Sequence, residues 1–291
     1  MSSEPHGRVR SLLTQLGALL LRLWPSLRWA RALLLAGVTP VIVMGIFFLY
    51  AYSGSYPAER LSHKAAPSLK VLDRNDRLLR EFSGDESRYY RWISVDTLPA
   101  HVIHCFLHSE DRSFRSHGGV SWGALLRAVK DNITHGEVVS GASTITMQLA
   151  RLLHPSRRTL GAKLREVVEA YRLERVLSKT EILEHYINRL PFGHGAVGIE
   201  AAAWAYFKKR ASDLSLAQIA FLVVIPRSPS WYDPRRSFNR VKRMQERLLK
   251  SMVGLSWLSS TERLAAMGEP IVLATEGSPF DAPHFTRYLR S

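Results

Sequence analysis

The pattern of apolar and polar positions divides this chain into an uncharged stretch near its start and a long run of amphipathic segments. From Leu98 to Met252 apolar residues recur at the spacing of one helical face. The first helix starts at Thr97-Leu98-Pro99, where proline suits a first turn. Later segments with the same spacing are Leu160–Leu177, Ile182–Leu190, a stretch from Ser215 that must end before Pro226, and Arg235–Met252. The sequence therefore predicts a mainly α-helical domain.

Two of these helices have recognisable starts. Ser178-Lys179-Thr180-Glu181 and Ser215-Leu216-Ala217-Gln218 both match the capping box, in which a serine and an acid or amide three residues later satisfy free amides reciprocally. The segment Arg235–Met252 combines basic and apolar faces, which predicts a basic amphipathic surface helix.

The uncharged stretch is residues 32–52, which is long enough, at about 1.5 Å per residue, to cross a hydrocarbon core of about 30 Å. It follows an Arg-rich segment, residues 1–31, whose only acid is Glu4. The positive flank predicts a single transmembrane helix in the cytoplasmic (inner) membrane, with the N-terminus in the cytoplasm and everything after the span outside it. A cleaved signal peptide is the alternative, but the apolar run is too long and lacks a clear cleavage site.

The remainder of the chain divides into a polar linker (residues 53–67), one larger domain (68–255) and a C-terminal linker-like tail (256–291). The domain opens with a predicted β-hairpin, Leu69–Leu72 and Leu78–Phe82, because turn-forming residues separate these two short apolar runs. A further helix over Val120–Val129 carries Trp122 and Leu126 on one face. That face either packs in the core or dips into the bilayer, and the sequence leaves both interpretations open.

The composition narrows the class of partner. Of 291 residues, 46% are hydrophobic and 22% are charged, which is ordinary for a globular protein. The formal net charge of +15 is not ordinary, and it predicts an anionic partner: nucleic acid, an acidic bilayer or a phosphorylated substrate. The single cysteine, Cys105, falls on an apolar helical stripe and is interpreted as a small core residue.

Candidate chemistry begins at Ser109–Gly119, where the first predicted helix ends with Glu110 and Asp111. Glu110 follows Phe106 by one helical turn, so we expect it at the edge of an apolar surface, where desolvation makes a carboxylate a better proton acceptor. A solvated surface pair is the simpler interpretation of two adjacent acids.

A second stretch, Gly141–Arg151, favours the interpretation of Glu110 as a proton acceptor over that of a surface acid. Its sequence Gly-Ala-Ser-Thr-Ile-Thr-Met-Gln-Leu-Ala-Arg, together with Ser109–Gly119, resembles the first two motifs of the peptidoglycan glycosyltransferases (family 51), which polymerise lipid II. The Met147-Gln148 pair, where most members have two glutamines, is most similar to the penicillin-binding protein 1C branch. The resemblance extends over about Val71 to Met252.

The resemblance implies a fold and a reaction. The fold is a mainly α, lysozyme-like glycosyltransferase domain, preceded here by a small β-hairpin and the N-terminal transmembrane helix. Glu110 takes the role of the base that activates the GlcNAc 4-hydroxyl of lipid II for attack on C1 of the strand's terminal MurNAc, with inversion to a β-1,4 link. The implied partners are lipid II, the growing lipid-linked strand and the membrane, with other cell-wall synthesis proteins left open.

A departing diphosphate needs positive charge, because guanidinium and ammonium groups bind phosphate oxygens strongly. Arg151, Arg157, Arg158 and Lys163 supply that charge, and Ser143, Thr144 and Thr146 supply hydroxyl groups, although a helix cap is the simpler interpretation of Ser-Thr-Ile-Thr. With the resemblance, the expected substrate-binding residues are Asp111, His117, Ser143, Thr144, Gln148, Arg151, Arg158, Lys163 and Asn188.

The second family carboxylate maps onto Glu166, in a motif whose leading arginine is replaced here by Ala162. Lys163 and Glu166 share one helical face, so a surface ion pair is the alternative to a catalytic role. Gln245 stands where the last family motif has an arginine, and Arg243 or Arg247 could substitute. The resemblance also implies Mg²⁺ or Mn²⁺ carried by the diphosphate, and no metal site made by protein side chains alone.

The same residues allow three other interpretations: a histidine metal site, a lytic glycosidase and a basic binding protein. His101, His104 and His108 lie on one side of a helix, but no further ligand accompanies them, so we interpret them as surface histidines. A lytic glycosidase would need no arginines around a second carboxylate, and a basic membrane protein that binds nucleic acid or anionic lipid would leave Glu110 unexplained, so no nucleic acid is expected. The sequence contains neither Ser-x-x-Lys nor Lys-Thr-Gly, so we expect glycan transfer without peptide cross-linking.

Overall fold

The computed structural model describes residues 38–62, 69–75, 78–82, 89–136, 143–157, 159–254 and 257–275. The chain divides into two compact units, Met1–Gly54 and Ser55–Ser291. In the first unit, residues 38–53 form a helix whose side chains are mostly exposed, among them Val41, Ile46 and Leu49. Among the described residues no helix has both the length and the apolar character to cross a membrane. The first part of the predicted span, residues 32–37, lies outside the described residues.

The second unit is mainly helical, as predicted. Its α-helices are α2 (Ala100–Glu110), α3 (Trp122–His135), α4 (Ile145–Leu153), α5 (Leu160–Val176), α6 (Lys179–Ile187), α7 (Ile199–Phe207), α8 (Leu216–Val223), α9 (Phe238–Val253) and α10 (Ser260–Gly268). Its short 3-10 helices are η1 (Ala58–Arg60), η3 (Val95–Thr97), η4 (Phe114–Ser116), η5 (Ala211–Asp213) and η6 (Ile225–Arg227). Strands β1 (Leu69–Leu72) and β2 (Leu78–Phe82) pair antiparallel, which confirms the predicted hairpin, and β3 (Tyr89–Tyr90) pairs in parallel with β4 (Ala196–Val197).

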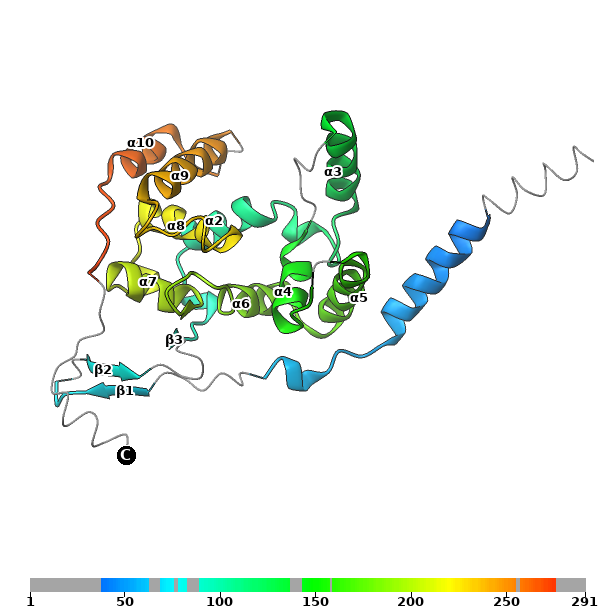
Figure 1. Cartoon of the computed structure of the whole chain (residues 1–291), viewed down its shortest axis with the longest axis horizontal. Helices are drawn as coiled ribbons and strands as arrows, with labels where there is room; N and C mark the ends of the chain where they lie inside the picture. Colours follow the sequence, from blue (N-terminus) through cyan, green and yellow to red (C-terminus); the bar gives the residue numbers. More distant parts are fainter. Residues whose placement is uncertain are drawn as a thin grey trace, which may run out of the picture. The chain divides into compact units, whose positions relative to one another are not determined.

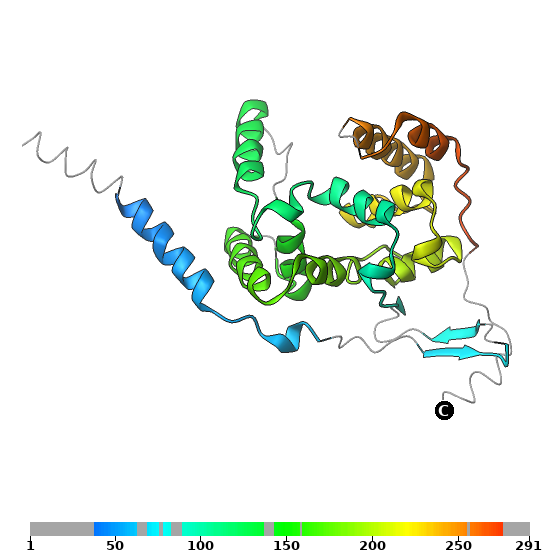
Figure 2. The same ribbon diagram turned by 180° about the vertical axis from the view of Figure 1, so that it is seen from behind.

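The helices of this unit form two levels (Figures 1 and 2). Helix α4 packs against α5 and α6 at one level, while α8 packs against α2 and α9, and α10 covers α9. Helix α3 extends upward to the height of α9 and α10 in both views. Both predicted capping boxes are present, at Ser178 and Ser215, and α8 ends before Pro226 as expected.

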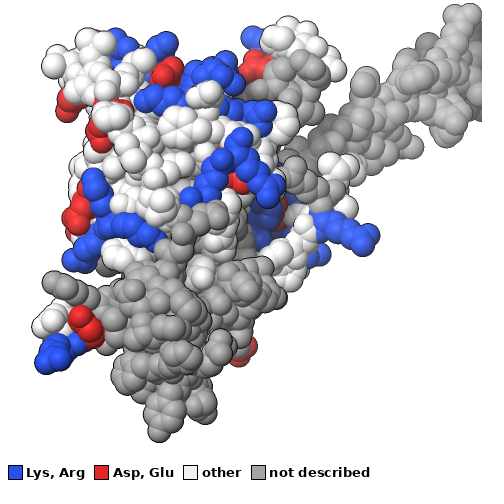
Figure 3. Space-filling model, turned by 60° about the vertical axis from the view of Figure 1, so that its left-hand side comes forward, with Lys and Arg blue, Asp and Glu red and all other residues white. Residues whose placement is uncertain are grey.

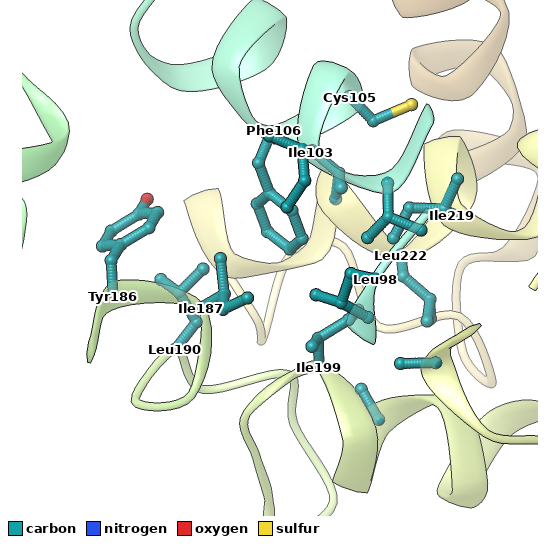
Figure 4. Close-up of a cluster of buried hydrophobic side chains, with 14 of the residues drawn as sticks. Leu98, Ile103, Cys105, Phe106, Tyr186, Ile187, Leu190, Ile199, Ile219 and Leu222 are labelled. Atoms are coloured by element: carbon teal, nitrogen blue, oxygen red, sulfur yellow. The ribbon is translucent and has the colours of Figure 1, made fainter. Parts of the chain in front are cut away.

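The core lies where α2, α6, α7 and α8 meet (Figure 4). Helix α8 is buried from Ala217 to Val223, because all of these residues except Gln218 are apolar. Phe106 and Cys105 of α2 are fully buried in the same cluster, which confirms the interpretation of Cys105 as a core residue. Burial raises the pKa of the Cys105 thiol to about 12. Each large apolar side chain buried in this way contributes about 1.5–3 kcal/mol to stability.

The excess positive charge lies on the surface, where basic side chains outnumber acidic ones over the face seen in Figure 3. Helix α9 illustrates the arrangement: Arg243, Arg247 and Lys250 are exposed, whereas Val241 and Leu249 are buried. The predicted basic amphipathic helix is therefore confirmed.

Helix α3 decides one of the alternatives that the sequence left open. Leu126 is 71% exposed and Trp122 is 41% exposed, whereas the buried side of the helix is formed by Ala128. The core-packing interpretation is therefore wrong for Leu126, whose side chain is exposed, although Trp122 on the same face donates to the Tyr171 hydroxyl of α5 at 2.9 Å. Ile133, 76% exposed, extends the same apolar face.

A glycine is required at position 198, where the chain turns from β4 into α7. Gly198 has a φ of +86°, and a Cβ there would lie 2.8 Å from the carbonyl oxygen of Asn188. Asn188 is itself buried: its Nδ2 donates to the carbonyl oxygens of Ile93 and Glu184, and its Oδ1 accepts from the Ile93 amide. This block joins the start of the unit to α6 and α7.

His108 does not lie on the surface, so the interpretation of the three histidines of α2 is wrong at this position. Its side chain is buried against α9, where Nε2 lies 2.7 Å from Oγ of Ser251, and its ring contacts Trp257 edge-on. Burial, together with the positive charge of Arg112, lowers the pKa of His108 to about 4. The folded chain thus holds this imidazole neutral at pH values where the unfolded chain protonates it.

We therefore expect the free energy of unfolding to fall as the pH is lowered from about 6.5 to about 4. In that window the unfolded state binds more protons than the folded state, and a shift of this size corresponds to roughly 3 kcal/mol. Denaturant unfolding of His108→Gln should show a weaker pH dependence than the wild type. His104→Gln, an exposed histidine one turn earlier, should leave it unchanged, and an equal slope in all three proteins would contradict the assignment.

Candidate active site

Glu110 is the last residue of α2, and both oxygens of its carboxylate are held by neighbouring donors. Oε1 accepts from the Ser109 hydroxyl at 2.9 Å and pairs with Nε of Arg227 at 3.3 Å. Oε2 accepts from Nε2 of Gln148 at 3.2 Å. The side chain remains 15% exposed, so the carboxylate is fixed in direction and is still open to a ligand.

Gln148, on α4, is itself oriented from the other side. The hydroxyl of Tyr186 donates to Oε1 of Gln148 at 3.0 Å, which turns the amide NH₂ group toward Glu110. Tyr186 is almost fully buried, and its pKa is raised well above 10.0 by burial and next by the negative charge of Glu110. The phenol therefore stays protonated and keeps the amide in one orientation.

Asp111 connects the end of α2 to the start of α4. Its Oδ2 accepts from the amide of Ile145, the first residue of α4, at 3.1 Å and lies 2.8 Å from Nε2 of His117. His117 in turn accepts from the Gly119 amide through Nδ1. The two expected substrate-binding residues Asp111, which is buried, and His117, which is half-buried, are thus bonded within the protein, and they set Glu110 opposite Gln148.

The hydroxyls of Thr144 and Thr146 are also occupied. Thr144 caps α4, accepting from the Met147 amide and donating to the carbonyl oxygen of Gly119 at 2.6 Å. Thr146 is fully buried and donates to Oε1 of Glu174 at 2.6 Å. The helix-cap interpretation therefore applies to Thr144, and neither hydroxyl is directed to an incoming phosphate in this structure.

A basic cluster surrounds Glu166 on α5. Lys163 Nζ lies 2.7 Å from Oε2 of Glu166 and donates to Oγ of Ser143 at 2.7 Å, while Nη1 of Arg151 lies 3.8 Å from Oε1. Arg151 and Lys163 are about 40% exposed, whereas the Glu166 side chain is 11% exposed. The predicted shared face of Lys163 and Glu166 is confirmed, and the two cations exceed the single acid.

Helix α4 brings this cluster next to Glu110. Gln148 contacts Glu110, and Arg151, on the next turn of the same helix, contacts Glu166. The phenol of Tyr186 experiences the charges of both Glu110 and Arg151, so both groups lie within electrostatic range of that side chain. Two motifs far apart in the sequence therefore meet along one helix.

Other expected residues lie elsewhere or outside the described part of the chain. Arg158 is outside the described residues, and Arg157 is exposed. The contacts of Asn188 go to Ile93 and Glu184, as described above. Gln245 is fully buried and donates to the carbonyl oxygen of Ala217 in α8 at 2.7 Å, so it occupies a core position.

Arg227 was not predicted as a site residue. It lies in η6, directly after Pro226, and its guanidinium contacts Glu110 and Ser109. The sequence signal at this point, Pro226, predicts where α8 ends but not what the following arginine reaches. Arg227 can be recognised as a site residue only when the position of α2 in the fold is known.

Comparison with known proteins shows the family of this chain. Residues 75–253 match the family model described as Transglycosylase. Penicillin-binding protein 1C of Escherichia coli (strain K12) is 35% identical over 227 residues, or 78% of this chain and 30% of that protein. Penicillin-binding protein 1A of Aquifex aeolicus (strain VF5) is 33% identical over 259 residues, or 88% of this chain and 35% of that protein.

A crystal structure of penicillin-binding protein 1A from Haemophilus influenzae matches 77% of this chain and 24% of that chain, with 21% identity and a TM-score of 0.43. The chain spans about a third of the length of the curated relatives it matches. The family assignment rests on the family model, which extends over most of the helical unit and includes Glu110, Gln148, Arg151 and Glu166. This chain belongs to the transglycosylase family.

Proposed function

We propose that this chain is a peptidoglycan glycosyltransferase that polymerises lipid II into β-1,4-linked glycan strands and releases undecaprenyl diphosphate. The observation that carries the proposal is the arrangement along α4, where Gln148 holds the Glu110 carboxylate and Arg151 joins the Lys163–Glu166 pair one turn later. Membership of the transglycosylase family supports the same reaction class. The reaction needs both elements, because a hydroxyl must lose a proton while a diphosphate leaves.

In this mechanism Glu110 accepts the proton of the GlcNAc 4-hydroxyl as that oxygen forms a bond to C1 of the terminal MurNAc. The bond from C1 to the diphosphate oxygen breaks, and its electron pair leaves with the diphosphate. Arg151 and Lys163 bind the departing anion, since both side chains are partly exposed and carry surplus positive charge beside Glu166. The Ser143 hydroxyl accepts a hydrogen bond from Nζ of Lys163 and therefore lies beside this ammonium group.

A divalent cation fits this scheme through the substrate. Diphosphate oxygens suit Mg²⁺ or Mn²⁺, which prefer hard oxygen ligands. Glu166 is the carboxylate next to the basic side chains and is the residue of this chain that would help to hold such an ion or to orient the cations around it. The ion would supply further positive charge to the leaving group.

The lytic alternative is less consistent with these contacts. A glycosidase that cleaves finished strands has no diphosphate to bind, so it gains nothing from Arg151 and Lys163 around a buried carboxylate. A purely basic binding protein gains nothing from a carboxylate whose two oxygens are oriented by a serine, an arginine and a glutamine. Glycan transfer uses both features.

The substrate's lipid also requires access to a membrane. We propose that residues 32–52 anchor the chain in the cytoplasmic membrane as a single span, with the helical unit on the outer side, because this stretch is uncharged and follows a basic segment. The exposed apolar face of α3, formed by Trp122, Leu126 and Ile133, is proposed to enter the bilayer surface. Arg127 and Lys130 beside this face are exposed and suit anionic headgroups.

Glu110→Gln should abolish strand growth from labelled lipid II and Mg²⁺, because the amide cannot accept the hydroxyl proton; a loss of at least about 100-fold is expected. Gel analysis of the products measures it, and an unchanged thermal midpoint shows that the fold is retained. Glu246→Gln, on α9, serves as the control. Normal polymerisation by Glu110→Gln would disprove the assignment of the base, and cleavage of preformed strands by the wild type without polymerisation would favour the lytic enzyme.

Arg151→Ala should weaken donor binding before it affects the chemical step. Loss of a charged hydrogen bond to phosphate costs about 1.5–3 kcal/mol, so KM for the lipid-linked donor should rise by roughly 10-fold or more. Steady-state kinetics at varied lipid II concentration separates KM from kcat, with Arg175→Ala, on α5, as the control. An unchanged KM would show that Arg151 does not bind the diphosphate.

A fluorophore attached to Leu126→Cys should report an apolar environment when the full chain is reconstituted in vesicles, because we place this face of α3 in the bilayer. The experiment is clean because Cys105, the only natural cysteine, is buried. His135→Cys, two and a half turns along the same helix and therefore on its opposite side, is the matched control and should remain in water. Equal emission and equal quenching by lipid-bound quenchers at both positions would contradict the proposed orientation.

A further inference from the structure

We propose that Arg227 and Ser109 are positioning residues that fix the direction in which the Glu110 carboxylate accepts a proton. The inference rests on the proposed function, since it assumes that Glu110 is the base. It goes further by assigning a role to two residues whose chemistry the sequence motifs do not specify.

The contacts form a closed arrangement at the end of α2. Nη2 of Arg227 donates to the carbonyl oxygen of Ser109 at 2.7 Å and to its Oγ at 3.1 Å, and Nε pairs with Oε1 of Glu110 at 3.3 Å. Oγ of Ser109 also donates to Oε1 at 2.9 Å. One guanidinium therefore ties the side chain of Glu110 to the backbone of the residue before it.

The residues immediately before Arg227 fix the position of its backbone. Val224 and Ile225 are buried in the core, and Pro226 fixes the backbone of η6 immediately before the arginine. The carbonyl oxygens at the end of α2 carry partial negative charge and lack partners within the helix, so a guanidinium is well matched to them. Arg227 is thus rooted in rigid structure although its side chain is 40% exposed.

This arrangement determines how many directions remain open at Glu110. An ionised carboxylate has about four lone-pair sites. Three donors among the described residues occupy it: Ser109 and Arg227 at Oε1, and Gln148 at Oε2. About one site is left for an incoming hydroxyl, so the orientation of the carboxylate is fixed before the acceptor sugar binds. The planar fork of arginine is needed because one group must reach two acceptors at once.

The test uses the purified full chain, lipid II and Mg²⁺, with Arg227→Met as the main variant. We expect kcat to fall by about 100-fold, the loss caused by misplacing a catalytic group by about 1 Å, while KM changes little. Arg227→Lys should recover part of kcat because it keeps the charge. Arg236→Met, an arginine that is 86% exposed, is the matched control and should behave as the wild type in activity and thermal midpoint.

A double-variant cycle tests whether the two residues act through the same carboxylate. Because Ser109 and Arg227 share Oε1, Ser109→Ala combined with Arg227→Met should lose less than the product of the separate losses. Strictly multiplied losses, wild-type kcat in Arg227→Met, or a raised KM with kcat retained would each overturn the proposal. The last result would mean that Arg227 binds substrate directly.

A readout without substrate separates this inference from the proposed function. Carbodiimide labels accessible carboxyl groups, and mass spectrometry measures the rate at Glu110. Arg227→Met should speed this labelling, since the carboxylate loses its neighbouring cation and its restraint, while Arg236→Met should not. An unchanged rate would overturn the positioning role even if lipid II is polymerised, and a faster rate would support it even if the wild type makes no strands.

Discussion

The arrangement of this site depends on one buried carboxylate, that of Asp111. Its Oδ2 accepts from the first amide of α4 and lies against His117, so it bonds the end of α2 to the start of α4. A helix start offers free amides and partial positive charge, which makes a carboxylate its natural partner. Because Glu110 precedes Asp111 and Gln148 lies in the first turns of α4, this single contact sets the base opposite the amide that holds it.

From that contact the site extends in two directions. Toward the core, Tyr186 orients Gln148 and is itself packed among apolar side chains of α2 and α6 (Figure 4). Toward the surface, Arg151 and Lys163 are partly exposed around Glu166. In the proposed reaction, Tyr186 and Gln148 hold the base in one orientation, and Arg151 and Lys163 bind an anion. Both functions are needed for transfer of a sugar from a diphosphate.

The sequence predicted the features that local pattern controls. The helical spacing and the serines of the capping boxes act within a few residues, so the helical character of residues 98–252 and the starts of α6 and α8 were predictable. Helix α10 was not predicted, because it lies in the stretch 256–291 that was interpreted as a linker-like tail. Glu110, Gln148 and Arg151 were identified from the first two motifs, and the Lys163–Glu166 pair from a further motif of the same family. The structure brings these residues together along α4.

Features that depend on packing between distant segments were not predictable. Arg227 reaches Glu110 only because α8 and η6 lie beside the end of α2. His108 was interpreted as a surface residue because its burial is caused by α9 and Trp257, far along the chain. The hydroxyls of Thr144 and Thr146 were considered for phosphate binding, but Gly119 and Glu174 occupy them, and neither partner is visible from the local sequence.

The central proposal is that Glu110, which contacts α4 through Gln148, and the cluster of Arg151 and Lys163 act on the same substrate. A structure of the chain bound to lipid II with a non-cleavable diphosphate tests it most directly. We expect diphosphate oxygens in contact with Arg151 and Lys163, and a sugar hydroxyl within hydrogen-bond distance of the Glu110 carboxylate. A diphosphate bound away from α4, or a hydroxyl that never approaches Glu110, would contradict it.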